Sequence, residues 1–166
     1  MPSTSLNSTR LLSQEKIAFT IHEFPDSIHS AEEVADFVGL PPERVYKTLV
    51  VLRQGPRAKP MLIMAPANSQ LDLKLVAKAV GDKKVQMASQ QEAERLTGLK
   101  VGGISALALL NKGFDIYLDE SARNQDAILI SAGQRGVNLE LAVADLVKVT
   151  RARWVEAARL NPVENR

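Results

Sequence analysis

The sequence contains no cysteine, and this absence excludes disulfides, thiolate nucleophiles, zinc–cysteine centres and iron–sulfur clusters. It contains only two histidines, His22 and His29, so a multi-histidine metal site would need several carboxylates to converge on them. The chain also lacks the GxGxxG and GxxxxGKS/T fingerprints that cradle nucleotide phosphates. We therefore expect neither a metal nor an organic cofactor.

Long apolar runs and an excess of one charge are absent as well. The 21 Lys and Arg residues against 19 Asp and Glu residues leave a net charge of +2, which provides no large basic surface to hold nucleic acid unaided. No stretch approaches the ~20 apolar residues that span a bilayer, and the polar first ten residues lack the apolar core of a secretory signal. No helix-turn-helix pattern with a basic recognition helix is visible. These absences predict a cytoplasmic protein with no membrane partner and no sequence-specific DNA binding.

The chain does contain enough apolar material for one core. Of its 166 residues, 45% are hydrophobic and 24% are charged, and proline and glycine never cluster into a linker. We expect a single domain over residues 1–166. Predicted strands and helices mix without a regular βαβ alternation, and this favours an α+β fold over a doubly wound sheet.

Apolar periodicity, capping boxes at Ser30 and Ser89, and glycines after apolar stripes place the elements of this fold. Helices are predicted over residues 4–16, 30–39, 72–81, 89–98, 139–149 and 154–160. Strands are predicted over residues 18–24, 45–53, 60–67, 85–88, 114–118 and 127–130, and the second and third of these form a hairpin.

Lys47 is unusual because it lies in a strand that is apolar on both faces. Alternation puts it on the same face as Val45, Leu49 and Val51, while the opposite face is apolar as well. Burying an ammonium in such a strand is costly unless the group is paired or faces a cavity. The residue pattern leaves two interpretations open: a functional lysine in a pocket, or a lysine near the strand's start whose ammonium reaches water.

Two loops rich in small residues could hold a ligand through backbone N–H groups. Val101–Ser105 contains adjacent glycines that allow close approach of a ligand, and Ser105 adds a hydroxyl. Ser131–Gly136 follows a strand and contains one cation, Arg135, which could clamp an anion. Ordinary turns explain both patterns equally simply.

Other polar residues support no hydrolase triad. The chain has no Gly-x-Ser-x-Gly motif, and neither histidine has a partner at triad spacing. We interpret His22 as a structural histidine on a strand and His29 as a loop residue. A basic stretch is interpreted as a solvated face, with contact to a phosphate backbone as the alternative; it contains Lys74, Lys78, Lys83 and Lys84.

Five stretches are individually weak but specific in their order and separation. They are Lys16–His22, Arg44–Leu49, Gln70–Lys74, Val101–Ser105 and Ser131-x-Gly133-x-Arg135-Gly136. In this arrangement the chain resembles the YbaK/EbsC-type aminoacyl-tRNA deacylases, trans-editing domains related to the insertion domain of prolyl-tRNA synthetase. The resemblance covers nearly the whole chain and is closest to the YbaK branch, which resembles a Cys-tRNA(Pro) deacylase.

The resemblance implies a mixed, β-barrel-like sheet flanked by helices, with a small pocket for the aminoacylated 3′ end of a tRNA and prolyl-tRNA synthetase as a partner. It assigns the family's essential lysine to Lys47. It implies that the Gly102–Gly103 loop and Ser131 line the pocket around the ester and the sugar hydroxyls. The full set of implied substrate-binding residues is Phe24, Ser30, Thr48, Gly102, Gly103, Ile104, Ser105, Ser131, Gly133, Arg135 and Asn138.

Several residues depart from the family pattern on the expected pocket wall. They are Phe24 for tyrosine, Ser30 for phenylalanine, Ala106 for proline, Ala132 for glycine, Gln134 for lysine and Asn138 for aspartate. The reaction class is therefore better specified than the amino acid removed. A module that binds a tRNA end or a synthetase without catalysis is the alternative function.

The chemistry implied by the resemblance needs no protein nucleophile. An aminoacyl ester is already activated, so Lys47 and loop N–H groups can act by positioning it and by stabilising its developing oxyanion. In the YbaK branch the attacking group is the substrate's own cysteine thiol, which cyclises and releases the tRNA. Attack by a positioned water is the alternative.

Overall fold

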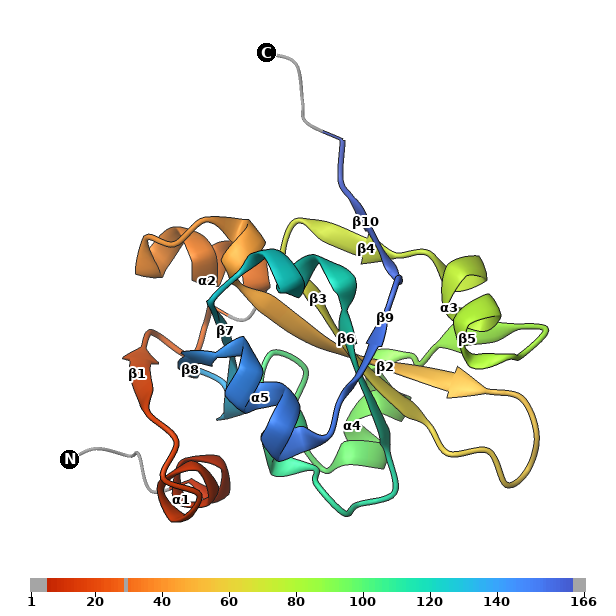
Figure 1. The fold of residues 1–166 in the computed structure, drawn as a ribbon, viewed down its shortest axis with the longest axis horizontal. Helices are drawn as coiled ribbons and strands as arrows, with labels where there is room; N and C mark the ends of the chain where they lie inside the picture. The colour runs from red at the N-terminus through yellow and green to blue at the C-terminus, as the bar shows by residue number, and fades with distance from the viewer. Residues whose placement is uncertain (1–5, 29, 163–166) are drawn as a thin grey trace.

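The computed structural model describes residues 6–28 and 30–162, which form helices packed around three β-sheets (Figure 1). The α-helices are α1 (Asn7–Gln14), α2 (Ala31–Val38), α3 (Leu73–Val80), α4 (Gln90–Thr97) and α5 (Val143–Thr150). The strands are β1 (Phe19–Glu23), β2 (Tyr46–Arg53), β3 (Met61–Pro66), β4 (Ser69–Leu71), β5 (Val85–Met87), β6 (Asp115–Asp119), β7 (Ala127–Gln134), β8 (Val137–Ala142), β9 (Arg153–Val155) and β10 (Ala158–Leu160). Short 3₁₀ helices are η1 (Pro42–Arg44), η2 (Ala106–Ala108) and η3 (Glu120–Asn124). The α+β class predicted from the sequence is confirmed.

The largest sheet has five strands in the order β5-β2-β3-β6-β9. β2 and β3 form the predicted antiparallel hairpin, in which Lys47 pairs with Ala65, while β6 runs parallel to both β3 and β9. A three-stranded antiparallel sheet, β1-β8-β7, lies beside it, and β4 pairs with β10. A single parallel bridge between Val45 and Leu129 joins the two larger sheets. The described strands thus form separate sheets, and the barrel-like sheet implied by the resemblance does not close.

β3 is the central strand of the five-stranded sheet, and every one of its residues is buried. Leu62 and Met64 face a large core that also contains the inner residues of β7 and β8. Met61 and Ile63 face a smaller core under α3. This two-sided burial explains the continuous apolar run of residues 61–66 in the sequence, since β3 has no solvated face. Among the residues described, no helix is long and apolar enough to cross a bilayer.

Helix boundaries follow the capping residues that the sequence predicts. Ser30 Oγ accepts a hydrogen bond from the Glu33 N–H, and Asp72 Oδ1 accepts from the Leu75 N–H. Ser89 and Glu92 form a reciprocal capping box at the start of α4. Because these contacts are local in the chain, the beginnings and ends of α2, α3 and α4 are predictable from the sequence alone.

The helix predicted over residues 139–149 begins too early, and the helix predicted over residues 154–160 is wrong. Residues 137–142 form β8 and α5 begins only at Val143, because Leu139 and Leu141 are buried between the partners β1 and β7. Residues 154–160 contain β9 and β10, which pair with β6 and β4. In both segments, pairing with distant strands determines the structure, and a local apolar pattern cannot distinguish it from a short helix.

Asp119, at the end of β6, fastens the C-terminal strands to the rest of the fold. Its Oδ1 accepts hydrogen bonds from the N–H groups of Ala157 and Ala158, both at 2.9 Å, and its Oδ2 accepts from the Ser121 N–H at 3.1 Å. Asp119 is 4% exposed, so water cannot readily replace the carboxylate as acceptor. The carboxylate therefore fixes the chain direction from β9 into β10.

We expect Asp119→Ala to lower the free energy of unfolding by about 3–5 kcal/mol, because three N–H groups lose their acceptor. The neighbouring exposed residue Glu120 provides the matched control, and Glu120→Ala should change stability by less than ~1 kcal/mol. Urea denaturation of both variants measures the difference. Equal, small losses would show that Asp119 does not hold the C-terminal strands.

Candidate functional site

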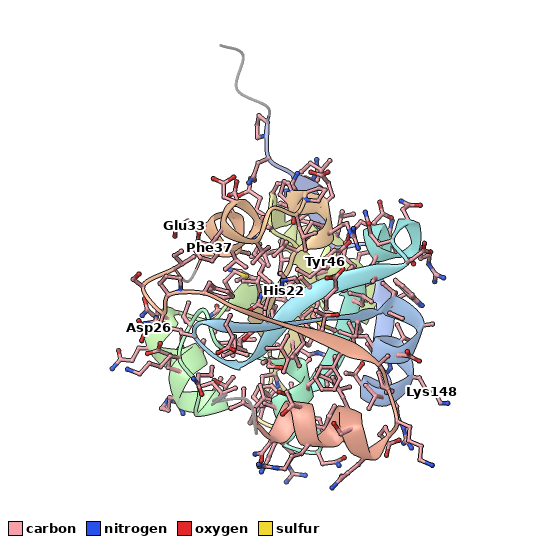
Figure 2. The ribbon with its side chains drawn as sticks, turned by 90° about the vertical axis from the view of Figure 1, so that its left-hand side faces the viewer. His22, Asp26, Glu33, Phe37, Tyr46 and Lys148 are labelled. Atoms are coloured by element: carbon pink, nitrogen blue, oxygen red, sulfur yellow. The ribbon has the colours of Figure 1, made fainter. Side chains whose placement is uncertain are left out.

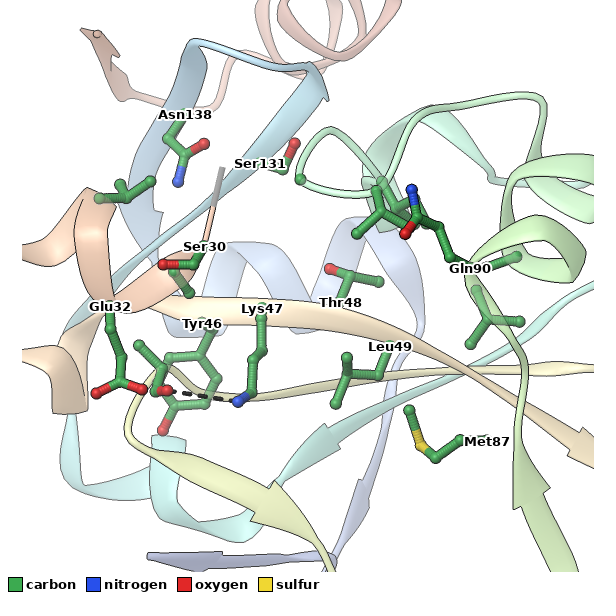
Figure 3. A pocket seen from close by; sticks show the side chains of 18 of the residues that line it. Ser30, Glu32, Tyr46, Lys47, Thr48, Leu49, Met87, Gln90, Ser131 and Asn138 are labelled. Carbon is green, nitrogen blue, oxygen red and sulfur yellow. Dashed lines mark hydrogen bonds between the residues drawn. The ribbon is translucent and has the colours of Figure 1, made fainter. Parts of the chain in front are cut away.

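A pocket of 380 Å³ opens beside β2, between α2, α4 and the 101–104 loop (Figure 3). Most of its wall is apolar, which is typical of small-molecule sites in which a few polar groups orient the ligand. The side chains that supply polar groups are Ser30, Glu32, Tyr46, Lys47, Thr48, Gln90, Ser131 and Asn138. The pocket is large enough for a small acyl ester and too small for a folded macromolecule.

The pocket exists because one edge of β2 is only partly covered. β3 pairs with β2 from Tyr46 to Val51, whereas on the other edge β5 pairs only from Val51 onward. The Val50 carbonyl accepts a hydrogen bond from Ala88 on this second edge. By the two-residue period of a strand, the backbone N–H and C=O of Thr48 point to the same edge, beside the pocket.

Lys47 precedes Thr48 on β2 and lines the pocket, and two backbone carbonyls hold its ammonium. Lys47 Nζ donates to the carbonyl of Ser69 and, at 3.4 Å, to the carbonyl of Ala67. Ala67 lies in the turn between β3 and β4, and Ser69 is the first residue of β4. The prediction that Lys47 faces a pocket is confirmed.

The positive charge of Lys47 is not neutralised by an ion pair with any described carboxylate. Burial lowers the pKa of Lys47 below its ordinary value, and the nearby carboxylate of Glu32 on α2 opposes this shift (Figure 3). Within the described residues, Lys47 forms no ion pair with a carboxylate. Carbonyl oxygens orient the ammonium without neutralising it, so it can still attract a developing negative charge.

Hydroxyl and amide groups complete the polar part of the wall. Thr48 Oγ1 is buried without a hydrogen-bond partner, a costly arrangement that a bound ligand would relieve. Ser131 and Asn138 pair across β7 and β8 and are both largely buried. Ser131 Oγ accepts from the Gly133 N–H at 3.2 Å, which leaves its own hydrogen free to donate.

Comparison with known proteins shows to which family the chain belongs. The sequence model of the aminoacyl-tRNA editing domain matches residues 25–149. A curated relative from Enterococcus faecalis, EbsC, is 38% identical over 90% of this chain and 91% of its own. The chain belongs to the aminoacyl-tRNA editing domain family. The resemblance found in the sequence motifs is therefore confirmed.

The chain is similar to whole proteins of about its own length and to part of a longer enzyme. EbsC is provisionally named a Cys-tRNA(Pro)/Cys-tRNA(Cys) deacylase. The proline–tRNA ligase of Staphylococcus aureus is 24% identical over 68% of this chain, which corresponds to 19% of that enzyme's length. A crystal structure of the hypothetical protein APE2540 has a TM-score of 0.83 at 20% identity, covering 92% of this chain and 99% of its own. Another, provisionally described as a trans-editing enzyme for prolyl tRNA synthetase, has a TM-score of 0.77 at 24% identity, covering 95% and 99%.

The editing-domain pocket brings together seven of the twelve residues singled out in the sequence. These are Ser30, Lys47, Thr48, Gly102, Ile104, Ser131 and Asn138. They come from segments far apart in the chain: the start of α2, β2, the 101–104 loop, β7 and β8. Their convergence supplies the geometry for binding, while the role of each one remains a prediction.

The other five residues lie outside the pocket wall. Phe24 packs against the exposed Phe37, with ring centroids 6.4 Å apart. Figure 2 shows Phe37 on α2. Ser105 is fully buried and accepts from the Leu107 N–H, so it begins η2. The remaining three, Gly103, Gly133 and Arg135, line a neighbouring hollow of 570 Å³.

Gly103 and Arg135 do not line the pocket; they hold the loop over residues 101–104 against the turn between β7 and β8. A Cβ at Gly103 would lie 2.9 Å from the Arg135 nitrogen and 3.0 Å from the Gln134 carbonyl carbon, so this glycine allows two backbone segments to touch. Arg135 Nε donates to the Val101 carbonyl at 2.6 Å. The close approach predicted for this loop is real, but the neighbour is the turn between β7 and β8.

Some contacts at the site have no clear sequence signal. Glu32, Met87 and Gln90 line the pocket without belonging to any motif. The carbonyls of Ala67 and Ser69 hold Lys47, yet any residue type can supply a carbonyl. Only a correct prediction of the short strand β4, which no local pattern of residues 69–71 indicates, would have placed them.

The histidines lie away from the pocket wall or outside the described residues. His22 Nε2 lies 3.0 Å from Glu140 Oε1, and Arg44 donates to the other oxygen of the same carboxylate. This partly buried cluster joins β1, β8 and η1, and it supports the structural interpretation of His22. His29 lies outside the residues that the structure describes. Among the described residues, no three His, Cys, Asp or Glu side chains cluster in a way that could hold a metal ion.

The lowered pKa of Lys47 predicts how stability depends on this residue. The pKa of Lys47 in the folded protein lies below 10.5, so folding disfavours the charged form of this lysine. The free energy of unfolding of the wild type therefore rises as the pH increases from the pKa of Lys47 in the folded protein toward 10.5. Lys47→Met removes this cost. We expect the melting temperature of Lys47→Met at neutral pH to equal or exceed that of the wild type. Any difference in melting temperature should shrink as the pH rises toward 10.5.

Thermal denaturation from pH 7 to 11 makes the measurement, with Lys74→Met on the exposed side of α3 as the control. A large fall in melting temperature for Lys47→Met at neutral pH would instead show that the lysine is a structural support.

Proposed function

We propose that this editing-domain protein deacylates mischarged tRNA in the cytoplasm, with Cys-tRNA(Pro) as its principal substrate. The observation that carries the proposal is the Lys47 ammonium, oriented by the carbonyls of Ala67 and Ser69 and left without a carboxylate partner among the described residues. It lies at a pocket of suitable size in a chain of the editing-domain family. The relative EbsC, which aligns over nine-tenths of this chain, supports the same reaction class.

Lys47 would act on the carbonyl oxygen of the aminoacyl ester. When a nucleophile attacks the ester carbon, negative charge develops on this oxygen, and a fixed ammonium stabilises the charge more than it stabilises the ground state. The backbone N–H of Thr48, the next residue on β2, points to the open edge beside the pocket and provides a second donor. The ester itself is activated, so these two effects and the positioning of the substrate supply the catalysis.

The attacking group is best supplied by the substrate. The chain has no cysteine, and no histidine stands in the described pocket wall to activate one of its hydroxyls. Those hydroxyls belong to Ser30, Tyr46, Thr48 and Ser131. In the proposed step, the cysteinyl sulfur forms a bond to its own ester carbon and the bond from that carbon to the ribose oxygen breaks. The thiol proton passes to the ribose oxygen, so the products are a cyclic thiolactone and free tRNA.

The polar groups opposite β2 would bind the sugar. Thr48 Oγ1 lacks a partner and Ser131 retains a donor, so both can bond the hydroxyls of the terminal ribose. This division leaves the apolar part of the wall, including Met87 and Val101, for the aminoacyl side chain. Prolyl-tRNA synthetase is the natural partner, because the same domain type matches part of a proline–tRNA ligase.

Removal of the ammonium tests the catalytic role of Lys47. We expect Lys47→Ala to lower kcat/KM on Cys-tRNA(Pro) by about 10²–10³-fold or more, the range measured for the loss of one oxyanion donor. Lys74→Ala, which removes an exposed lysine of α3, should leave the rate unchanged. Deacylation of radiolabelled Cys-tRNA(Pro) measures both variants, after circular dichroism has shown that each is folded. Wild-type turnover by Lys47→Ala would contradict the proposal.

A substrate comparison tests the nucleophile. If the substrate's thiol attacks, Cys-tRNA(Pro) should yield a thiolactone, and Ala-tRNA(Pro), which fits the same pocket but has no thiol, should be nearly inert. Attack by water predicts a difference of only about 10–200-fold between two side chains of similar size. Mass spectrometry of the released amino acid, together with the two rates, distinguishes the routes. Release of free cysteine with comparable rates on both substrates would overturn the thiol route.

A further inference from the structure

A second hollow of 940 Å³, not used by the proposed chemistry, lies where α1 and α5 end, beside the loops that precede β3 and β6. Its wall is predominantly polar and contains five cationic side chains from separate segments. These are Lys16, Lys59, Lys148, Arg151 and Arg153, and we name this hollow the basic groove. Figure 2 shows Lys148 at the outer side of the molecule, pointing away from the ribbon.

The fold does not neutralise the cations of the basic groove. In the part of the chain that the structure describes, none of the five forms an ion pair with a carboxylate. The groove also contains Glu15, Asp115 and Asp145, but Asp115 already lies 3.8 Å from Arg53. Positive charge is therefore in excess here, although the whole chain carries only +2.

Two of the cations occupy backbone positions that favour glycine. Lys16 and Arg151 follow α1 and α5 in the left-handed conformation, with φ of 58° and 56°. The left-handed residue that ends each of α2, α3 and α4 is a glycine. The remaining non-glycine residue with positive φ in the described chain, Asn111, lines the same groove. Non-glycine residues in this conformation carry a conformational cost, and such strained positions cluster at functional sites.

The basic groove is close enough to the pocket for one tRNA to reach both. Ile104 lines the pocket, and Leu110, six residues later, lines the groove. Six residues span at most roughly 20 Å even when fully extended. One strand of a nucleic-acid duplex passes roughly six phosphates over that distance.

We propose that the basic groove binds the phosphate backbone of the same tRNA whose aminoacylated end occupies the pocket. The inference rests on the proposed function. Cations that contact phosphates add affinity without reading bases, so the groove contributes to binding of tRNAs in general and not to selection of tRNA(Pro).

The test replaces the two strained cations by the residue that their backbone favours. The double variant Lys16→Gly/Arg151→Gly relieves the left-handed positions, so it should remain folded while losing two charges. The matched control, Lys74→Ala/Lys78→Ala, removes two exposed charges from α3 and leaves the same net charge. Deacylation is measured on Cys-tRNA(Pro) and on a cysteinylated CCA trinucleotide, each at several salt concentrations.

We expect the groove variant to lose roughly tenfold or more in kcat/KM on the full tRNA and to reduce the slope of log(kcat/KM) against log(salt) by roughly 1.5–2, because each lost phosphate contact removes nearly one unit. Its rate on the trinucleotide, and both rates of the control, should equal those of the wild type. Equal losses on the two substrates, or a salt slope that matches the control, would overturn the groove's role.

Failure of the proposed function is distinguishable from failure of the groove. If the wild type turns over neither substrate, the deacylase proposal is wrong. Binding of uncharged tRNA(Pro), measured by fluorescence anisotropy over the same salt range, then decides the groove alone. A smaller slope for the groove variant than for the control supports it, and identical slopes contradict it.

Discussion

The hydrogen bonds between the Lys47 ammonium and the carbonyls of Ala67 and Ser69 are the interaction on which the site depends. A lysine side chain has several rotatable bonds, and an unrestrained ammonium beside an apolar pocket would turn toward water. The two carbonyls, supplied by the β3–β4 turn, fix the group without cancelling its charge. A carboxylate in their place would have neutralised the charge that the proposed chemistry needs.

The position of those carbonyls depends in turn on the C-terminal strand. β10 pairs with β4 from Ala158 to Leu160, and the Asp72 N–H donates to the Ala157 carbonyl at 2.7 Å. Asp119 fixes the start of β10 through two further backbone bonds. The last strand of the described chain thus supports the turn that holds Lys47, although no residue of β10 lines the pocket. Stability of the C-terminal segment and geometry of the site are physically linked.

The sequence predicts those parts of the fold whose causes are local. Asp72 and Ser89 cap helices through bonds that span at most three residues, and both caps are present as predicted. β8 and β10 were mistaken for helices because their identity depends on partners far along the chain. Lys47 could be singled out because a charge in a doubly apolar strand conflicts with its surroundings. Its acceptors could not, since they are backbone atoms placed by β4.

The basic groove illustrates the same limit for electrostatics. A net charge of +2 correctly describes the whole chain and indicates no large basic surface. It cannot reveal that Lys16, Lys59 and Arg151 converge from separate segments, because only the fold determines which charges become neighbours.

The central claim, that Lys47 is a charged group desolvated by the pocket and ready to stabilise an oxyanion, is tested most directly by the pKa of its ammonium. Heteronuclear NMR of protein labelled at the lysine side chains follows this group as the pH rises, and Lys47→Met identifies its signal. We predict a pKa below the ordinary 10.5, which rises when a non-hydrolysable phosphonate analogue of the tetrahedral intermediate places negative charge in the pocket. A pKa at the ordinary value that does not respond to the analogue would show that Lys47 is not the group that stabilises the oxyanion.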